Sequence, residues 1–265
     1  MNLTALIIGD IVGKPGRTHM GDVLPALVKQ HRPDIVIANG ENAAGGKGIT
    51  RVIVEELHDM GVDVITTGNH VWDQKETQDF IGDSPRLIRP ANYPPGVPGR
   101  GWVVWEPHPG KRAFAVVNLQ GRSFMAELDC PFQAADRILS EIQDHVPGNK
   151  KPAVIVDFHA ETTSEKESMG FYLAGRVAAV VGTHTHVQTA DERVLAGGTA
   201  YITDVGMTGV RDSVLGFDPQ IAIQRFLYQM PMRYEVAEGL CILNAVVITM
   251  DEASGLATRI ERICV

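Results

Sequence analysis

Five apolar runs of this chain each end in a polar side chain of a type that binds metal ions. The runs read TALIIGD, DIVIANGEN, DVITTGNH, AVIVDFHAE and VVGTHTHV, and they lie between residues 4 and 187. Each is rich in Val, Ile and Leu without strict alternation, which is typical of a strand buried on both faces. Each is also followed or preceded by a segment with helical periodicity. The pattern predicts an α/β protein with a parallel, doubly wound sheet.

The polar residues that close these runs are expected to meet at one edge of the sheet. Ligands of open α/β sheets bind outside the carboxyl ends of the strands, where all five runs end. Taken singly, Asp10 is also a typical helix N-cap and Asn69 a typical turn residue. The set as a whole indicates a metal site, because two of its histidines are two residues apart and point to the same side of an extended chain. The candidate site residues are Asp10, Glu41, Asn42, Asn69, His70, His159, His184 and His186.

The donor atoms of these residues favour a pair of transition-metal ions. Asp10 and Glu41 offer carboxylate oxygen, Asn42 and Asn69 offer amide oxygen, and the histidines other than His70 offer imidazole nitrogen. This mixture suits Mn, Fe, Zn or Co better than Mg or Ca. Seven ligands are too many for one ion and fit two ions roughly 3.5–4 Å apart, with one carboxylate between them and a shared hydroxide that attacks a phosphorus atom. The predicted reaction is phosphoester hydrolysis.

Composition agrees with an enzyme of this kind. The 265 residues are 44% hydrophobic, enough for one large α/β domain over residues 1–265. The net charge of -8 opposes non-specific binding to duplex nucleic acid, although a local basic patch stays open. Three widely spaced cysteines give no disulfide framework. No signal-peptide pattern is visible, and no run approaches the roughly 18 apolar residues of a membrane span, so we expect a soluble, cytoplasmic protein without a membrane partner.

The remaining periodicity predicts the order of elements. Closely spaced Pro and Gly make residues 87–101 a long connection. Residues 204–238 are expected to form an irregular insertion, with a helix-like stretch at QIAIQRFLYQ, that caps the site or makes a subunit contact. Strands are expected near 3–8, 34–38, 63–67, 102–106, 113–119, 153–158, 177–182, 199–203, 240–250 and 256–263, and helices near 16–30, 51–60, 74–81, 131–145 and 166–174.

Several motifs together resemble the YmdB-type family of calcineurin-like metallophosphoesterases. They are GDIVGKPGR, ANGENAAGGKGIT, TTGNHVWD, RPANYP, DFHAETTSEK, VGTHTHVQTAD and ITDVGMTG, and the resemblance runs from about residue 1 to 263. It implies layered β-sheets flanked by helices, in three or four layers, with the metal site at the carboxyl ends of the strands. It also implies hydrolysis of 2',3'-cyclic nucleotides and other phosphodiesters.

The resemblance implies a role for each candidate ligand. Asp10 and His186 would bind the first ion, and Glu41 would bridge the pair. The superfamily's usual Asp-x-His has Val12 at its third position here, and Asn42 is the replacement. Exchange of a softer ligand for a harder one shifts the expected preference toward Fe or Mn. The ligands implied for the second ion are Asn69, His159 and His184.

The resemblance implies that His70 protonates the leaving oxygen or steadies the phosphoryl group, since imidazole suits acid–base work near pH 7. An acidic residue usually follows this histidine, but here it is Val71. The carboxylate that orients His70 is therefore expected to be Asp73, Glu76 or a residue distant in sequence.

Some interpretations stay open at this point. The enzyme could act on phosphomonoesters of nucleotides or phosphoproteins, or the metal site could serve a regulatory protein that acts on RNA or a partner protein. Thr183 and Thr185 either orient ligands or are ordinary strand residues. Arg89 is a candidate for nucleotide contact, although an Arg before Pro is more often a solvated surface residue. We also expect a homo-oligomer.

Overall fold

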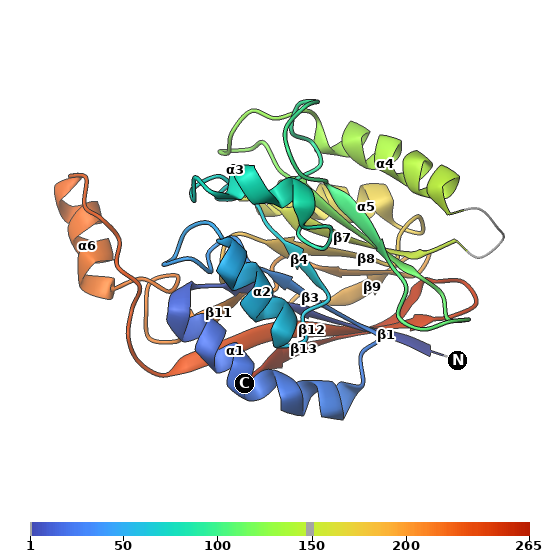
Figure 1. Cartoon of the computed structure of the whole chain (residues 1–265), viewed down its shortest axis with the longest axis horizontal. Helices are drawn as coiled ribbons and strands as arrows, with labels where there is room; N and C mark the ends of the chain where they lie inside the picture. The colour runs from blue at the N-terminus through green and yellow to red at the C-terminus, as the bar shows by residue number, and fades with distance from the viewer. Residues whose placement is uncertain (1, 147–150) are drawn as a thin grey trace.

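Two β-sheets stacked face to face form the centre of the molecule (Figure 1). The computed structural model describes residues 2–146 and 151–265. The seven-stranded sheet has the order β2-β11-β12-β1-β3-β4, with β13 also paired to β12, and the six-stranded sheet has the order β5-β6-β7-β8-β10-β9. The strands are β1 (Asn2–Ile8), β2 (Asp10–Ile11), β3 (Ile35–Asn39), β4 (Val64–Thr66), β5 (Trp102–Trp105), β6 (Phe114–Gln120), β7 (Ala153–His159), β8 (Ala179–Thr183), β9 (Arg193–Leu195), β10 (Thr199–Ile202), β11 (Met207–Val210), β12 (Cys241–Asp251) and β13 (Ala257–Cys264).

Parallel pairing aligns the ends of the strands within each sheet. In the first sheet β1, β3 and β4 run parallel, with Ile7 opposite Ile37 and Ile37 opposite Val64. In the second sheet β6, β7, β8 and β10 run parallel, with Gln120 opposite His159 and His159 opposite Thr183. The carboxyl ends within each parallel set therefore lie side by side.

Helices cover the outer face of each sheet and give four layers, which Figure 1 shows from α1 and α2 through the two sheets to α4 and α5. One buried cluster lies between the sheets and contains Ile7 and Ile155. A second cluster packs Leu24 of α1 and Leu57 of α2 on the first sheet, and a third packs Ile138 of α4 on the second. Each such side chain contributes about 1.5–3 kcal/mol by leaving water. The helices are α1 (Gly13–His31), α2 (Arg51–Asp59), α3 (Thr77–Phe80), α4 (Pro131–His145), α5 (Thr163–Leu173) and α6 (Pro219–Tyr228), with a short 3-10 turn, η1 (Ile81–Asp83).

The predicted layered α/β architecture is confirmed, but the predicted single parallel sheet is wrong. Two of the five apolar runs supply strands of the second sheet, β7 and β8, and the first sheet includes the antiparallel strands β12 and β13. A strand between a helix layer and another sheet is buried on both faces, like a strand between two helix layers. The apolar pattern is the same in both cases.

The segment 204–238 contains a strand that was not predicted, in addition to a helix where the helix-like stretch was expected. Residues 207–210 form β11, which pairs with β2 and β12 inside the first sheet. The helix α6 follows and extends away from both sheets at one side of the molecule (Figure 1). Its role as a cap or a subunit contact stays a prediction. Among the residues that the structure describes, no helix has the length and apolarity needed to span a membrane.

Candidate metal centre

Seven polar side chains from five strand ends gather in two groups. In the first group, Nε2 of His159 lies 3.0 Å from Oε1 of Glu41 and 2.9 Å from Oδ1 of Asn69. Nδ1 of His184 lies 3.0 Å from the same nitrogen of His159. The ligand atoms that Glu41, His159 and His184 offer all lie within 4.8 Å of one another. This spacing lets them hold one metal ion.

The second group also borders Glu41. Nε2 of His186 is 3.1 Å from Nδ2 of Asn42 and 3.7 Å from Oδ1 of Asp10. The amide of Asn42 is also 3.4 Å from Oε1 of Glu41. Glu41 therefore contacts both groups, and its carboxylate is the group that connects them.

The two groups contain atoms that a cation would satisfy. Asp10 and Glu41 are both fully buried, yet Oδ1 of Asp10 has no hydrogen-bond partner among the described residues. A buried carboxylate without compensation is costly, and metal coordination is one of the ways in which proteins offset that cost. Carboxylate oxygen, amide oxygen and imidazole nitrogen together form a donor set of transition-metal type. The residues fit divalent metal ions.

Burial and neighbouring charges set the protonation of these residues. Burial raises the pKa of Asp10 to about 6, and His186 and His159 offset it only partly. Burial acts the same way on Glu41, but His159 and His70 together outweigh it and hold the Glu41 pKa at about 2. Burial opposes the charge on His159, but Glu41 overcomes it and raises that pKa to about 9. The His184 pKa falls to about 3, through burial and then the charge of His159. Glu41 and His184 are thus held in the deprotonated forms that bind metals.

Each of the three histidines has an outer partner on its other ring nitrogen. His159 Nδ1 lies 2.9 Å from the hydroxyl of Thr183, which in turn donates to the buried carboxylate of Asp157 at 2.7 Å. His186 Nδ1 lies 3.0 Å from the carbonyl oxygen of Leu215. His184 Nε2 lies 2.9 Å from the carboxylate of Glu161. Such partners fix the tautomer and ring orientation of metal-binding histidines.

Of the two threonines that the sequence left open, Thr183 contacts His159 and Thr185 contacts a buried ion pair. The Thr185 N–H and hydroxyl both donate to Oδ2 of Asp204, at 3.0 and 2.7 Å. The same oxygen accepts a hydrogen bond from Lys166 at 2.7 Å, and both members of the ion pair are buried. His184 and His186 flank Thr185 with φ of 101° and 64°, a region costly for non-glycine residues. The ion pair therefore holds a strained loop.

The Lys166–Asp204 pair was not among the residues predicted from the sequence. Asp204 follows the apolar strand β10 much as Asp10 follows β1, and this pattern in the sequence could have marked Asp204 as a functional residue. It was obscured because Asp204 opens the segment interpreted as an insertion. Lys166 lies in a strongly charged helical turn, where a lysine is normally solvated.

His70 borders the first group and has a clear orienting residue. Its backbone N–H donates to Oε2 of Glu41 at 3.0 Å, and its Nδ1 lies 3.0 Å from Oδ2 of Asp73. Val71 is buried in the core. Glu76 instead accepts a hydrogen bond from the backbone of Arg51. The sequence offered Asp73 and Glu76 as carboxylates that could orient His70, and Asp73 is the one that contacts it.

Gly68 allows the chain to pass close to the first group. A Cβ at this position would lie 2.3 Å from Nε2 of His159 and 2.5 Å from Oε2 of Glu41. Those distances are shorter than any van der Waals contact. A side chain here would displace the candidate ligands.

The expectation that Arg89 is a solvated surface residue is wrong. Its guanidinium is buried and donates to backbone carbonyls of Pro90, Val97 and Pro98. Arg89 thus organises the Pro-rich connection from inside, since five fixed donors can satisfy several carbonyls that no regular structure pairs. Sequence does not reveal this role, because it depends on how the connection folds back.

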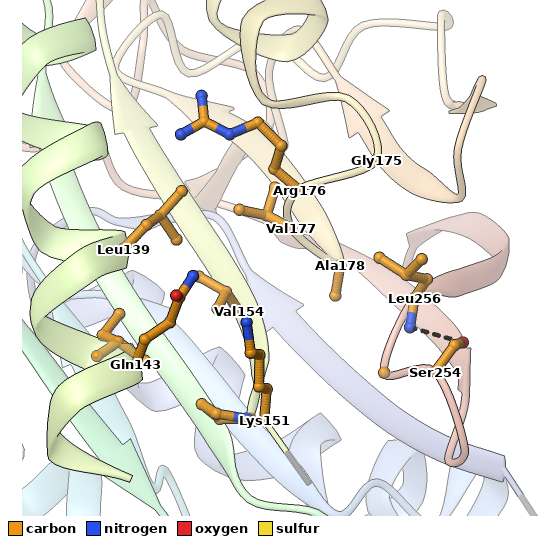
Figure 2. A pocket seen from close by; sticks show the side chains of 13 residues that line it. Leu139, Gln143, Lys151, Val154, Gly175, Arg176, Val177, Ala178, Ser254 and Leu256 are labelled. Atoms are coloured by element: carbon orange, nitrogen blue, oxygen red, sulfur yellow. Dashed lines mark hydrogen bonds between the residues drawn. The ribbon is translucent and has the colours of Figure 1, made fainter. Parts of the chain in front are cut away.

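The cavity shown in Figure 2 lies away from these residues. It measures ≈ 370 Å³ and is bounded by α4, the residues at the amino ends of β7 and β8, and the turn at Ser254. Parallel strands present their ligands at the carboxyl ends, which is the opposite edge. None of the eight candidate site residues lines this cavity.

The chain matches known proteins over nearly its full length. The family model described as YmdB-like protein matches residues 6–263. A 2',3'-cyclic-nucleotide 2'-phosphodiesterase of Bacillus subtilis (strain 168) is 51% identical over 260 residues, which are 98% of this chain and 96% of the relative.

Two solved structures are similar over nearly their full length. A hypothetical protein from Thermus thermophilus has a TM-score of 0.90 at 41% identity, covering 99% of each chain. A novel phosphatase from Mycoplasma pneumoniae has a TM-score of 0.91 at 34% identity, covering 100% of this chain and 94% of the phosphatase.

Proposed function

The chain belongs to the YmdB-like family, and from that membership and the geometry of its site we propose that it is a metal-dependent phosphodiesterase that hydrolyses 2',3'-cyclic nucleotides. The observation that carries the proposal is the position of Glu41. Oε1 of its carboxylate lies 3.4 Å from Nδ2 of Asn42, in one group, and 3.0 Å from Nε2 of His159, in the other. A carboxylate between two sets of donors is the arrangement that a two-ion hydrolase needs.

We assign two ions to these two groups of residues. Asp10, Asn42 and His186 would hold one ion, Glu41 would bridge, and the other ligands would be Asn69, His159 and His184. Iron or manganese is the expected metal, because oxygen donors outnumber nitrogen at the first position. Such a pair of ions supplies an activated water nucleophile and neutralises charge on the phosphoryl oxygens.

The chain's own residues would place and protonate the substrate. His70 is tied through its backbone to Glu41, so its ring lies at the border of the site. Asp73 holds Nδ1 of that ring and leaves Nε2 to donate a proton to the departing ribose oxygen. An alkoxide leaving group needs this proton, because it is a strong base.

The proposal is tested by identifying the product that the protein forms from 2',3'-cyclic AMP. Chelator-stripped protein should be inactive, and added Mn²⁺ should restore conversion to 3'-AMP, separated from 2'-AMP by chromatography. Glu41→Gln should lose this activity, whereas Glu55→Gln, at an exposed position of α2, should keep it. Turnover of 3'-AMP without turnover of the cyclic diester would favour a phosphomonoesterase instead. Binding of metal without either turnover would favour a regulatory protein. Action on RNA and a homo-oligomeric state stay predictions.

A further inference from the structure

The turn that follows β6 borders the candidate metal centre. Gln120, the last residue of β6, is opposite His159 in the parallel β6–β7 pair. The next residue, Gly121, donates its N–H to the carbonyl oxygen of His159 at 2.9 Å. The chain therefore leaves the sheet directly beside a candidate ligand.

Hydrogen bonds hold this turn in place from two sides. The carboxylate of Glu165 accepts the N–H groups of Arg122 and Ser123, at 3.0 and 3.1 Å. The buried side chain of Asn92 accepts from the N–H of Gln120 and donates to its carbonyl, at 2.9 and 2.8 Å. The turn is thus anchored at its base.

Phe124 occupies a position in this turn that favours glycine. The N–H of Met125 donates to the carbonyl of Arg122 at 3.2 Å, which places Phe124 at the third position of a four-residue turn with φ of 59°. Turns with positive φ at this position normally have Gly or Asn there. A bulky residue with positive φ is an outlier, and such strain tends to persist at functional sites.

The Phe124 side chain gains nothing from packing that would offset this strain. It is 92% exposed, so its ring buries almost no surface within the chain. Neither the turn nor the core therefore accounts for an aromatic residue here. A hollow of ≈ 490 Å³ lies at the foot of the turn, lined by Arg122, Ser123, Glu127, Leu128 and Glu165.

We infer that Phe124 is a substrate-binding residue that stacks on the nucleobase, an assignment that rests on the proposed function. Phe124 lies three positions after Gly121, so its Cα is at most about 11 Å from that of Gly121, the residue whose N–H bonds the His159 carbonyl. Stacking on an aromatic side chain tolerates any base, because every base has a π-face. Phe124 thereby selects nucleoside phosphodiesters over phosphodiesters without a base.

Two substrates and two variants test the inference. Phe124→Gly and Phe124→Tyr are compared with wild type on 2',3'-cyclic AMP and on the 2',3'-cyclic phosphate of methyl riboside, which lacks the base. For Phe124→Gly we expect KM for the nucleotide to rise roughly tenfold, within the range of one base–aromatic stack, with kcat and the base-free substrate unchanged. Phe124→Tyr should keep the wild-type KM. Phe171→Ala, at another exposed Phe, is the control.

Stability separates binding from a structural role. Glycine relieves the positive φ, so Phe124→Gly should melt at or above the wild-type temperature while it binds the nucleotide more weakly. An equal change of KM for both substrates, an unchanged KM, or a lower melting temperature that accounts for the loss would overturn the inference. Wild-type turnover of 2',3'-cyclic AMP shows that the proposed function holds even where the inference fails. Turnover of neither substrate by the wild type overturns both.

Discussion

Nδ1 of His70 lies 3.0 Å from Oδ2 of Asp73, one turn of chain further on. Both side chains are partly exposed, so the contact stands at the rim of the site and not in the core. It leaves Nε2 of His70 as the nitrogen that can donate a proton to substrate. In the proposed mechanism, Asp73 would therefore act on the reaction through the orientation of His70.

We expect Asp73→Asn to lower kcat for 2',3'-cyclic AMP by roughly 10–100-fold, a fraction of what a positioned general acid contributes. Turnover of bis-p-nitrophenyl phosphate should change much less, because p-nitrophenolate leaves without protonation. Steady-state kinetics on both substrates measure the difference. Glu76→Gln is the control, since Glu76 contacts Arg51 and not His70. An equal loss of turnover on the two substrates would show that His70 does not act as the general acid.

Gly68→Ala should abolish metal binding while the fold persists. The new Cβ would lie within 2.5 Å of both His159 and Glu41, so the candidate ligands must move. Metal content per chain, read after dialysis, is the measurement, with circular dichroism to check the fold. Gly82→Ala is a matched control, because nothing lies within 4 Å of a Cβ there. Normal metal content in Gly68→Ala would mean that the ligands lie elsewhere.

Lys166→Met should lower the free energy of unfolding by about 3–5 kcal/mol, because it leaves the buried carboxylate of Asp204 unpaired. Urea denaturation gives the value. Arg137→Met removes the exposed ion pair with Glu141 and should cost under about 1 kcal/mol. A loss as small for Lys166→Met as for Arg137→Met would show that the buried pair does not hold the loop around Thr185.

The strands and helices could be predicted from sequence because burial leaves a local signature. The apolar run before Asp10 and the apolar run before His184 both form strands, as their composition predicts. The division of these strands between two sheets could not be predicted from their apolar pattern, since it depends on long-range packing of one sheet on the other. The strand β11 was not predicted because its four residues include a threonine and a glycine and show no apolar periodicity.

The composition of the site was predictable where polar residues close apolar runs, as at Asn69 and His159. The partners that orient these residues were not, because they come from other parts of the chain. Asp157 acts on His159 through Thr183 of the neighbouring strand. Leu215 reaches His186 through a backbone carbonyl, which carries no sequence signal at all.

The most direct test of a two-ion phosphodiesterase is a titration of the metal-free protein with Mn²⁺. Bound ions per chain and turnover of 2',3'-cyclic AMP are measured in the same samples, for wild type and for Glu41→Gln. We expect two ions per chain, activity that appears with the second ion, and loss of both the second ion and activity in Glu41→Gln. Full turnover with one ion or none, or an active Glu41→Gln enzyme, would contradict the assignment of Glu41 as the bridge of a catalytic pair.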